Sequence, residues 1–481
     1  MIILGTNSIK DTGYNVDNSA RFDGTTAYLN RTPGSASNRK TFTFSTWIKR
    51  SGIAGVTVHQ DIFSSDAGDD ESYIHFDTDS LKIFSTLPSS AGAAAGDPAC
   101  VLITNQKFRD FSAWYHIVVA VDTTQGTASN RVKLYINGTQ VTSFSTETYP
   151  DQNYQFATNA AVAHMIARRP AGGKFLPGYL AETVLVDGSQ LAPDQFGEFD
   201  EDSGIWKPID VSGLTFGTNG FYLPFENSGA LGQDDSGNGN NFTVNNLTSI
   251  DQSIDTCTNN FCTLNPLDNS QGVSFALAQG NLELNDIGSG DDDHGLRATF
   301  GVSSGKWYYE QKQHEAAGTV GLVGSDVRLV SDLENQTTSF HRLVGSNGSG
   351  SSIVYWSNGT FVNSSSLQGW AAGDIIGVAL DMDNGKLFFS INGVFKGFNN
   401  SSSDPVNGTN ANFTDIPTDG TFAMPYIGKR GTASPQASIN FGSPSFAISS
   451  GNSDGNGYGN FEYAVPSSYY SLCTKNLAEY G

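Results

Sequence analysis

Residues 375–395 read IIGVALDMDNGKLFFSINGVF, and this stretch decides the fold class. Two apolar runs, 375–380 and 386–391, are separated by Asn384-Gly385, and Asn392-Gly393 follows the second run. Both residues of an Asn-Gly pair tolerate positive φ, so this dipeptide is the strongest short signal for a β-hairpin. The stretch therefore predicts three antiparallel strands in succession.

The same pattern occurs in the first half of the chain. Residues 42–48 alternate between apolar and polar side chains, whereas residues 114–121 are apolar on both faces, as in a central sandwich strand. Residues 132–136 lead into Asn137-Gly138, which predicts another hairpin. Helical periodicity is almost absent. We therefore expect an all-β protein.

The composition limits the classes of partner. The 481 residues suffice for two or three domains, and 48 acidic against 26 basic residues give a net charge of −22. Such a charge argues against nucleic acid and anionic membrane surfaces as partners. Since no run approaches the roughly 20 apolar residues of a membrane span, we expect no membrane insertion. Residues 1–7 lack the basic and apolar regions of a secretory signal, so no export route is visible.

Changes in composition predict the domain boundaries. Residues 233–262 are rich in Asp, Gly, Asn and Ser and mark a boundary, and a second small-polar stretch begins at Ile448. Of the four scattered cysteines, Cys257 and Cys262 could pair locally or remain thiols. The predicted organisation is a first domain at 1–250, a linker at 251–269, a second domain at 270–447, and a Gly/Ser-rich segment with an aromatic tail at 448–481.

Five motifs in the first half occur in the order found in one domain family: 20–24, 42–48, 114–118, 133–138 and 178–182. This half, from about residue 15 to 250, resembles a laminin-G-like, concanavalin A-like domain. The resemblance implies a two-sheet jelly roll whose curved face or rim loops bind glycans, often beside calcium. Segments 221–226 and 235–240 look like the segments that usually begin such domains, but here they end the domain, which a permuted strand order would explain.

Four motifs of the second half also occur in the order found in one domain family: 305–310, 318–322, 370–381 and 387–393. This half, about residues 270–447, resembles a SPRY domain. That resemblance implies another concanavalin-like sandwich, used for recognition through its loops and without catalysis.

The combination of both domains with the aromatic C-terminus is similar to virion proteins of tailed phages, especially marine ones. This similarity implies assembly in the host cytoplasm, other virion proteins and a host-surface glycan as partners, and a homo-oligomer.

Aromatic residues beside turns are the candidate ligand-binding residues. Tyr355 and Trp356 precede Ser357-Asn358-Gly359, and Trp370 follows a glycine. Sugar rings stack on aromatic faces, so these three side chains could line a glycan site. Trp47, Trp114 and Trp307 lie within strand patterns, where core packing accounts for them better.

Two oxygen-rich segments are candidate calcium sites. Calcium prefers several oxygen ligands at close range, and Asp291, Asp292 and Asp293 could supply some of them. Asp235, Asn238 and Asn240 lie in a Gly-containing loop that also suits calcium. The alternatives are a solvated loop for the first segment and a structural turn for the second.

Catalytic motifs are weak. Carboxylates cluster at 198–202, but this run lacks the closing Glu of a laminarinase-like pattern. Glu182 and Asp187 have odd spacing and would face opposite sides of a strand. The sequence shows no HExxH, GxSxG or P-loop motif. We expect a non-enzymatic virion protein, a tail fibre, spike or capsid-surface component, that recognises host-surface glycans. A structural decoration or joining protein and a polysaccharide hydrolase remain alternatives.

Overall fold

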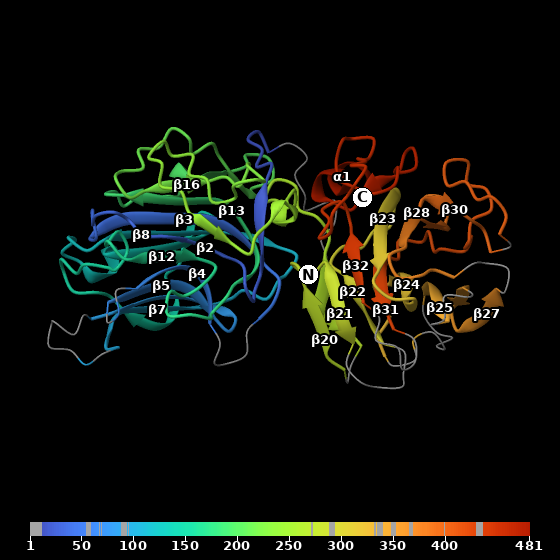
Figure 1. Cartoon of the computed structure of the whole chain (residues 1–481), viewed down its shortest axis with the longest axis horizontal. Coiled ribbons are helices and arrows are strands. Elements are labelled where there is room, and N and C mark those ends of the chain that lie inside the picture. The colour runs from blue at the N-terminus through green and yellow to red at the C-terminus, as the bar shows by residue number, and fades with distance from the viewer. Residues whose placement is uncertain are drawn as a thin grey trace. The chain divides into compact units, whose positions relative to one another are not determined.

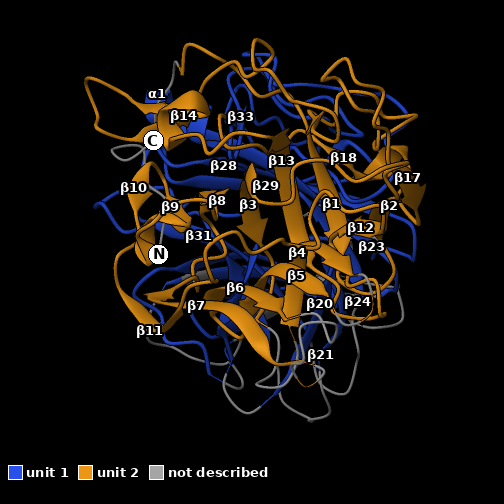
Figure 2. Ribbon diagram, turned by 90° about the vertical axis from the view of Figure 1, so that its left-hand side faces the viewer, with its two compact units in different colours: residues 1–11, 259–481 blue, residues 12–258 orange. Residues whose placement is uncertain are grey.

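The computed structural model divides the chain into two compact units, an N-terminal unit of residues 12–258 and a C-terminal unit that includes residues 259–481 (orange and blue in Figure 2). The boundary lies within the stretch predicted as a linker, and strands form on both sides of it. The residues described are 12–53, 59–66, 68, 70–87, 94, 96–270, 273–287, 294–330, 333, 340–347, 353–364, 369–398, 400–429 and 436–481.

The N-terminal unit is a sandwich of two eight-stranded sheets. The first has the order β10-β9-β8-β3-β13-β1-β18, with β16 also paired to β13, and the second has the order β11-β7-β6-β5-β4-β12-β2-β17 (Figure 1). The first sheet contains β1 (Ser19–Asp23), β3 (Thr41–Arg50), β8 (Trp114–Asp122), β9 (Val132–Ile136), β10 (Thr139–Gln140), β13 (Pro177–Asp187), β16 (Phe221–Leu223) and β18 (Gln252–Ser253). The second contains β2 (Tyr28–Arg31), β4 (His59–Asp66), β5 (Glu71–Asp77), β6 (Ser80–Thr86), β7 (Pro98–Lys107), β11 (Phe144–Thr148), β12 (Ala163–Ile166) and β17 (Thr243–Asn245). A separate hairpin pairs β14 (Gly197–Phe199) with β15 (Trp206–Pro208), and 3₁₀ turns occur at Ala128–Asn130, Pro193–Gln195 and Ser249–Asp251.

Apolar side chains from both sheets meet in one core. Phe44 of β3 stacks on Phe63 of β4, with ring centroids 4.8 Å apart. The segments that close the unit return to the strands that open it, because β17 pairs with β2 and β18 pairs with β1.

The strand β3 is buried on both faces, although its sequence alternates. Trp47 points away from the main core and packs with Val16, Trp114 and Trp206 in a second cluster. The polar residues on the same face as Trp47 are satisfied internally, for example by the 2.8 Å hydrogen bond that the Thr43 hydroxyl donates to the Ser189 carbonyl. The outer face of this sheet is thus covered by the chain's own segments.

The C-terminal unit is a second sandwich. Its sheets have the orders β19-β22-β31-β24-β25-β26-β27 and β20-β21-β32-β23-β28-β29-β30, with β33 also paired to β23. The first contains β19 (Leu264–Asn269), β22 (Gly295–Ala298), β24 (Ala317–Gly324), β25 (His341–Asn347), β26 (Ile353–Ser357), β27 (Thr360–Ser364) and β31 (Ala423–Gly428). The second contains β20 (Phe275–Ala278), β21 (Glu283–Ile287), β23 (Lys306–Gln313), β28 (Ile375–Asp381), β29 (Lys386–Ile391), β30 (Val394–Phe395), β32 (Ala437–Asn440) and β33 (Tyr470–Ser471).

The predicted meander is confirmed. The strands β28, β29 and β30 are consecutive antiparallel neighbours. Asn392 and Gly393 have φ values of 50° and 77°, as the hairpin signal requires. The all-β fold of two tandem concanavalin A-like sandwiches is likewise confirmed, and the single α-helix among the described residues is α1 (Thr474–Tyr480).

The aromatic tail packs onto the C-terminal unit. Its strand β33 runs parallel to β23, and Phe461 and Tyr469 join Tyr308 and Phe388 in a buried cluster. None of the four cysteines, Cys257 and Cys262 included, forms a disulfide. In the part of the chain that the structure describes, no helix has the length and apolar character needed to cross a bilayer.

Candidate functional site

A pocket of about 330 Å³ lies in the C-terminal unit beside the meander β28-β29-β30. This volume falls within the range of about 300–1,000 Å³ typical of small-molecule sites. The meander supplies five of the thirteen lining residues, β25 supplies one, and the segments before and after the meander supply the other seven. The lining residues are Val344, Gly369, Trp370, Asp374, Ile376, Phe389, Ile391, Asn392, Val394, Lys396, Phe398, Asn400 and Asn412.

Aromatic and aliphatic side chains form most of the pocket wall. Phe389 and Ile391 both line it because alternate residues of β29 share one face. Phe398 is held by stacking on Tyr355, with centroids 3.6 Å apart and planes 10° apart. Val394 lines the pocket and is 56% exposed, so it lies at the rim.

Several polar groups of the pocket are already engaged. The Asp374 carboxylate accepts hydrogen bonds from the Ala371 amide at 2.7 Å and from Asn392 Nδ2 at 2.8 Å. The Asn412 side chain accepts from the Phe389 amide and donates to the Lys396 carbonyl. These contacts hold the hairpin and the following loop together.

Three other polar groups have no partner among the described residues. The Trp370 indole is fully buried, yet its Nε1 has no hydrogen-bond acceptor. The half-buried Lys396 ammonium and the exposed Asn400 side-chain amide also lack polar contacts in that part of the chain. The pocket thus combines an apolar wall with unused donors, an arrangement that can hold a small ligand.

Of the three predicted aromatic residues, one lines this pocket. Trp370 lines it as a buried inner wall and not as an exposed platform, and Tyr355 does not line it but supports Phe398. Trp356 does not line the pocket, because adjacent residues of β26 face opposite sides of the sheet, and ligand binding by Tyr355 and Trp356 stays a prediction. Trp356 is 2% exposed and packs with Leu343 and Tyr426.

Lys396, Phe398 and Asn400 were not predicted from the sequence. They follow the hairpin of β29 and β30, and they meet Trp370 only through the fold. The local signal available for them was the Asn- and Ser-rich run after Phe398, which is typical of a surface loop.

The loop predicted to bind calcium satisfies its own polar groups. The amide nitrogens of Asn238 and Asn240 donate to backbone carbonyls, both reaching Gly220. The Arg31 guanidinium donates to Asn240 Oδ1, and Asp235 Oδ1 accepts from Gln233. A calcium ion here would have to compete with the positively charged Arg31 side chain and displace these hydrogen bonds.

Asp291, Asp292 and Asp293 lie outside the described residues, so calcium binding by them stays a prediction. Within the described residues, no group of three or more His, Cys, Asp or Glu is placed to hold a metal ion.

The acidic run 198–202 lies on the hairpin of β14 and β15. Lys207 Nζ lies 3.3 Å from Glu198 Oε1 and 3.5 Å from Asp200 Oδ2. Phe199, 52% exposed, packs edge-on against Trp206. These carboxylates serve the hairpin and do not line the pocket.

Glu182 is the most unusual carboxyl group of the N-terminal unit. It lies in a bulge of β13 with a φ of 48° and is 5% exposed. Tyr222 donates a hydrogen bond to it at 2.9 Å, and Tyr14 lies 3.4 Å away. Burial raises the pKa of Glu182 to about 7. Asp187 bonds to other partners, including the Asn219 amide, so the two carboxylates do not form a pair.

We expect Glu182→Gln to stabilise the protein at alkaline pH. The raised pKa means that the folded state favours protonated Glu182. The stability that this protonation contributes is complete below pH 4.5 and is lost as the pH rises through about 7. At about 1.4 kcal/mol per pKa unit, the variant should gain up to about 3 kcal/mol at pH 8.5 and little at pH 5. Urea unfolding across this range measures the difference. The exposed Glu201→Gln is the matched control, and a gain that does not depend on pH would contradict the assignment.

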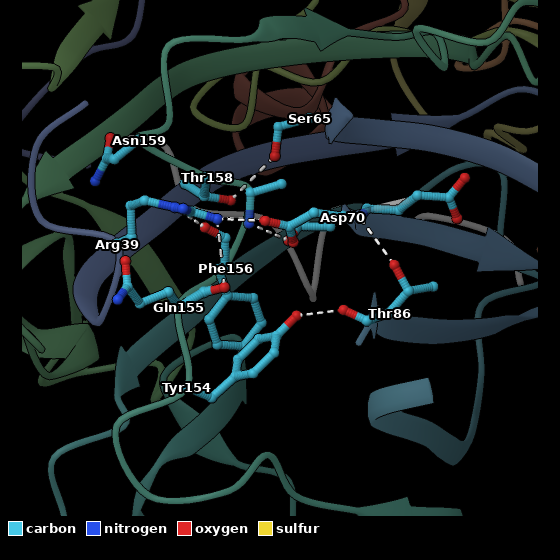
Figure 3. A network of polar contacts seen from close by, with 12 residues as sticks. Arg39, Ser65, Asp70, Thr86, Tyr154, Gln155, Phe156, Thr158 and Asn159 are labelled. Atoms are coloured by element: carbon cyan, nitrogen blue, oxygen red, sulfur yellow. Dashed lines mark hydrogen bonds and ion pairs between the residues drawn. The ribbon is translucent and has the colours of Figure 1, made fainter. Parts of the chain in front are cut away.

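A polar network around the loop 149–162 of the N-terminal unit has a structural role (Figure 3). Arg39 donates to the Phe156 carbonyl and pairs with Asp70. Tyr154 donates to the Thr86 carbonyl at 2.6 Å. These hydrogen bonds connect the loop to the end of β6 and to the segment before β3.

Comparisons with known proteins agree with the two sandwiches. Residues 23–194 match the concanavalin A-like lectin/glucanases superfamily, and residues 306–406 match the SPRY domain. No curated protein shows significant sequence similarity to the chain.

Solved structures give partial matches. The SPRY domain of human HERC1 is 20% identical, with a TM-score of 0.27, covering 37% of this chain and 96% of its own. A heptameric SAP-like pentraxin from Limulus polyphemus is 16% identical, with a TM-score of 0.28, and the match covers 38% of this chain and 82% of the pentraxin chain. The TRIM65 PSpry domain is 15% identical, with a TM-score of 0.26, and the match covers 37% of this chain and 91% of the TRIM65 chain. The two family matches alone show that the chain contains a concanavalin A-like domain followed by a SPRY domain, a combination that indicates binding or recognition.

Proposed function

We propose that this chain is a non-enzymatic recognition protein that binds a host-surface glycan through the pocket of its C-terminal unit. The observation that carries the proposal is a 330 Å³ pocket with an aromatic wall and unengaged polar groups, in a domain of a binding type. Aromatic faces take the C–H surfaces of a sugar ring, and polar groups at the rim bind its hydroxyls.

We further propose that the protein belongs to a tailed-phage virion, as a tail fibre, spike or capsid-surface component that forms a homo-oligomer. This part rests on the similarity of the domain combination and aromatic tail to such proteins. Mass spectrometry of purified virions tests it, since recovery of the chain only as free cytosolic material would exclude the role.

The binding proposal is tested with the purified chain on a panel of bacterial surface glycans and intact cells. We expect saturable binding without release of reducing ends. Release would indicate a polysaccharide hydrolase, and loss of binding in EDTA would indicate calcium. If the chain binds no glycan and no cell, the proposal fails and a structural role in the virion is favoured.

A rim variant tests whether the pocket is the binding site. Val394→Trp adds a large ring at the rim and should lower glycan affinity more than tenfold. Val406→Trp is the matched control, because Val406 is similarly exposed at 51% and does not line the pocket. Equal affinity of both variants would exclude the pocket as the site.

A further inference from the structure

The polar groups left unused in the pocket are mainly hydrogen-bond donors. The Lys396 ammonium offers donors alone, and the exposed Asn400 amide offers both kinds. A ligand that complements this set presents several acceptor oxygens. A carboxylate supplies them together with a negative charge.

The charges of the pocket point in the same direction. Two charged side chains line it, and the Asp374 carboxylate already accepts two hydrogen bonds. The half-buried Lys396 makes no ion pair with any described residue, so its positive charge can attract an acidic ligand, whereas the Asp374 oxygens are occupied by hydrogen-bond donors. Ammonium–carboxylate hydrogen bonds are roughly twice as strong as neutral ones.

We propose that this pocket selects acidic sugars: a carboxylate-bearing sugar residue binds with its carboxylate on Lys396 and its ring against Phe389 and Phe398. The proposal rests on the proposed function and narrows its ligand class. Neutral sugars lack the group that Lys396 requires.

Matched probes isolate the carboxylate. Oligosaccharides ending in galacturonate, glucuronate or sialic acid are each compared with their methyl esters, which keep the ring and remove the charge. By calorimetric titration in low salt, we expect at least one acid to bind tenfold or more tightly than its ester. The difference should shrink at 0.5 M NaCl because salt screens the pair.

Variants locate the interaction. Lys396→Met keeps the aliphatic stem and should reduce acid affinity about tenfold, to that of the ester, while ester binding and thermal stability stay unchanged. Lys133→Met in β9 is the control and should change neither affinity.

The outcomes separate this proposal from the proposed function. The present inference fails if binding of cells or neutral glycans depends on Val394 but shows no preference for acids. It also fails if a preference for acids survives Lys396→Met. Either result leaves the proposed glycan binding intact. Absence of binding to every glycan and cell overturns both.

Discussion

Asp255→Ala should lower the free energy of unfolding of the N-terminal unit by about 3–5 kcal/mol, because it leaves a buried ammonium without its counter-ion. Asp255 Oδ2 lies 2.7 Å from Lys49 Nζ, and both side chains are 1% exposed. Trp114 Nε1 donates to the other carboxylate oxygen at 3.1 Å. The substitution therefore removes one partner of a buried charge pair and also frees a buried donor.

Hydrogen exchange of β13 and urea unfolding measure this loss. The double variant Lys49→Met/Asp255→Leu removes both charges and should recover most of the stability, since apolar replacements of buried pairs are often neutral. Asp77→Ala is the second control. Its partner Lys82 lies 3.8 Å away and both side chains are partly exposed, so the cost should stay below about 1 kcal/mol. A similarly small loss for Asp255→Ala would refute the role given to the pair.

The fold could be predicted because its signals are local. Asn392-Gly393 and Asn137-Gly138 determine hairpins through backbone conformation alone, and runs such as 114–121 show burial on both faces. The burial of both faces of β3 could not be predicted, since it depends on the Val16 and Trp206 segments, which are distant in sequence.

The candidate site was predicted only in part, because it too depends on contacts between segments that are distant in sequence. Trp370 stood out as an aromatic residue beside a turn, but an adjacent pair such as Tyr355 and Trp356 is divided between two faces once the strand is known. Lys396 carries no motif. Its importance comes from lining a pocket with Val344 and Asn412, which only the folded sheets bring together.

The second large effect is expected at Asp454, which fastens the C-terminal tail. Its Oδ2 accepts hydrogen bonds from the Ser471 amide at 2.9 Å and from Asn476 Nδ2 at 2.8 Å, and its Oδ1 accepts from the Asn456 and Tyr458 amides. Asp454 is 6% exposed, so water cannot readily replace these bonds. Each buried donor left unsatisfied costs about 1–3 kcal/mol.

Asp454→Ala should therefore destabilise the packed tail by about 2–5 kcal/mol. A loss of 3 kcal/mol corresponds to roughly hundredfold faster amide exchange in the segment that contains β33 and α1. Exchange in β28 should stay slower than in the tail in both proteins, because the core strands open only in global unfolding, although the substitution lowers both opening free energies by the same amount. Asp419→Ala, which removes a cap from the exposed turn at Thr421, is the control and should leave both segments unchanged. If the tail amides exchanged as slowly as those of β28 in the unsubstituted protein, the tail would not open separately and Asp454 would stabilise the whole sandwich.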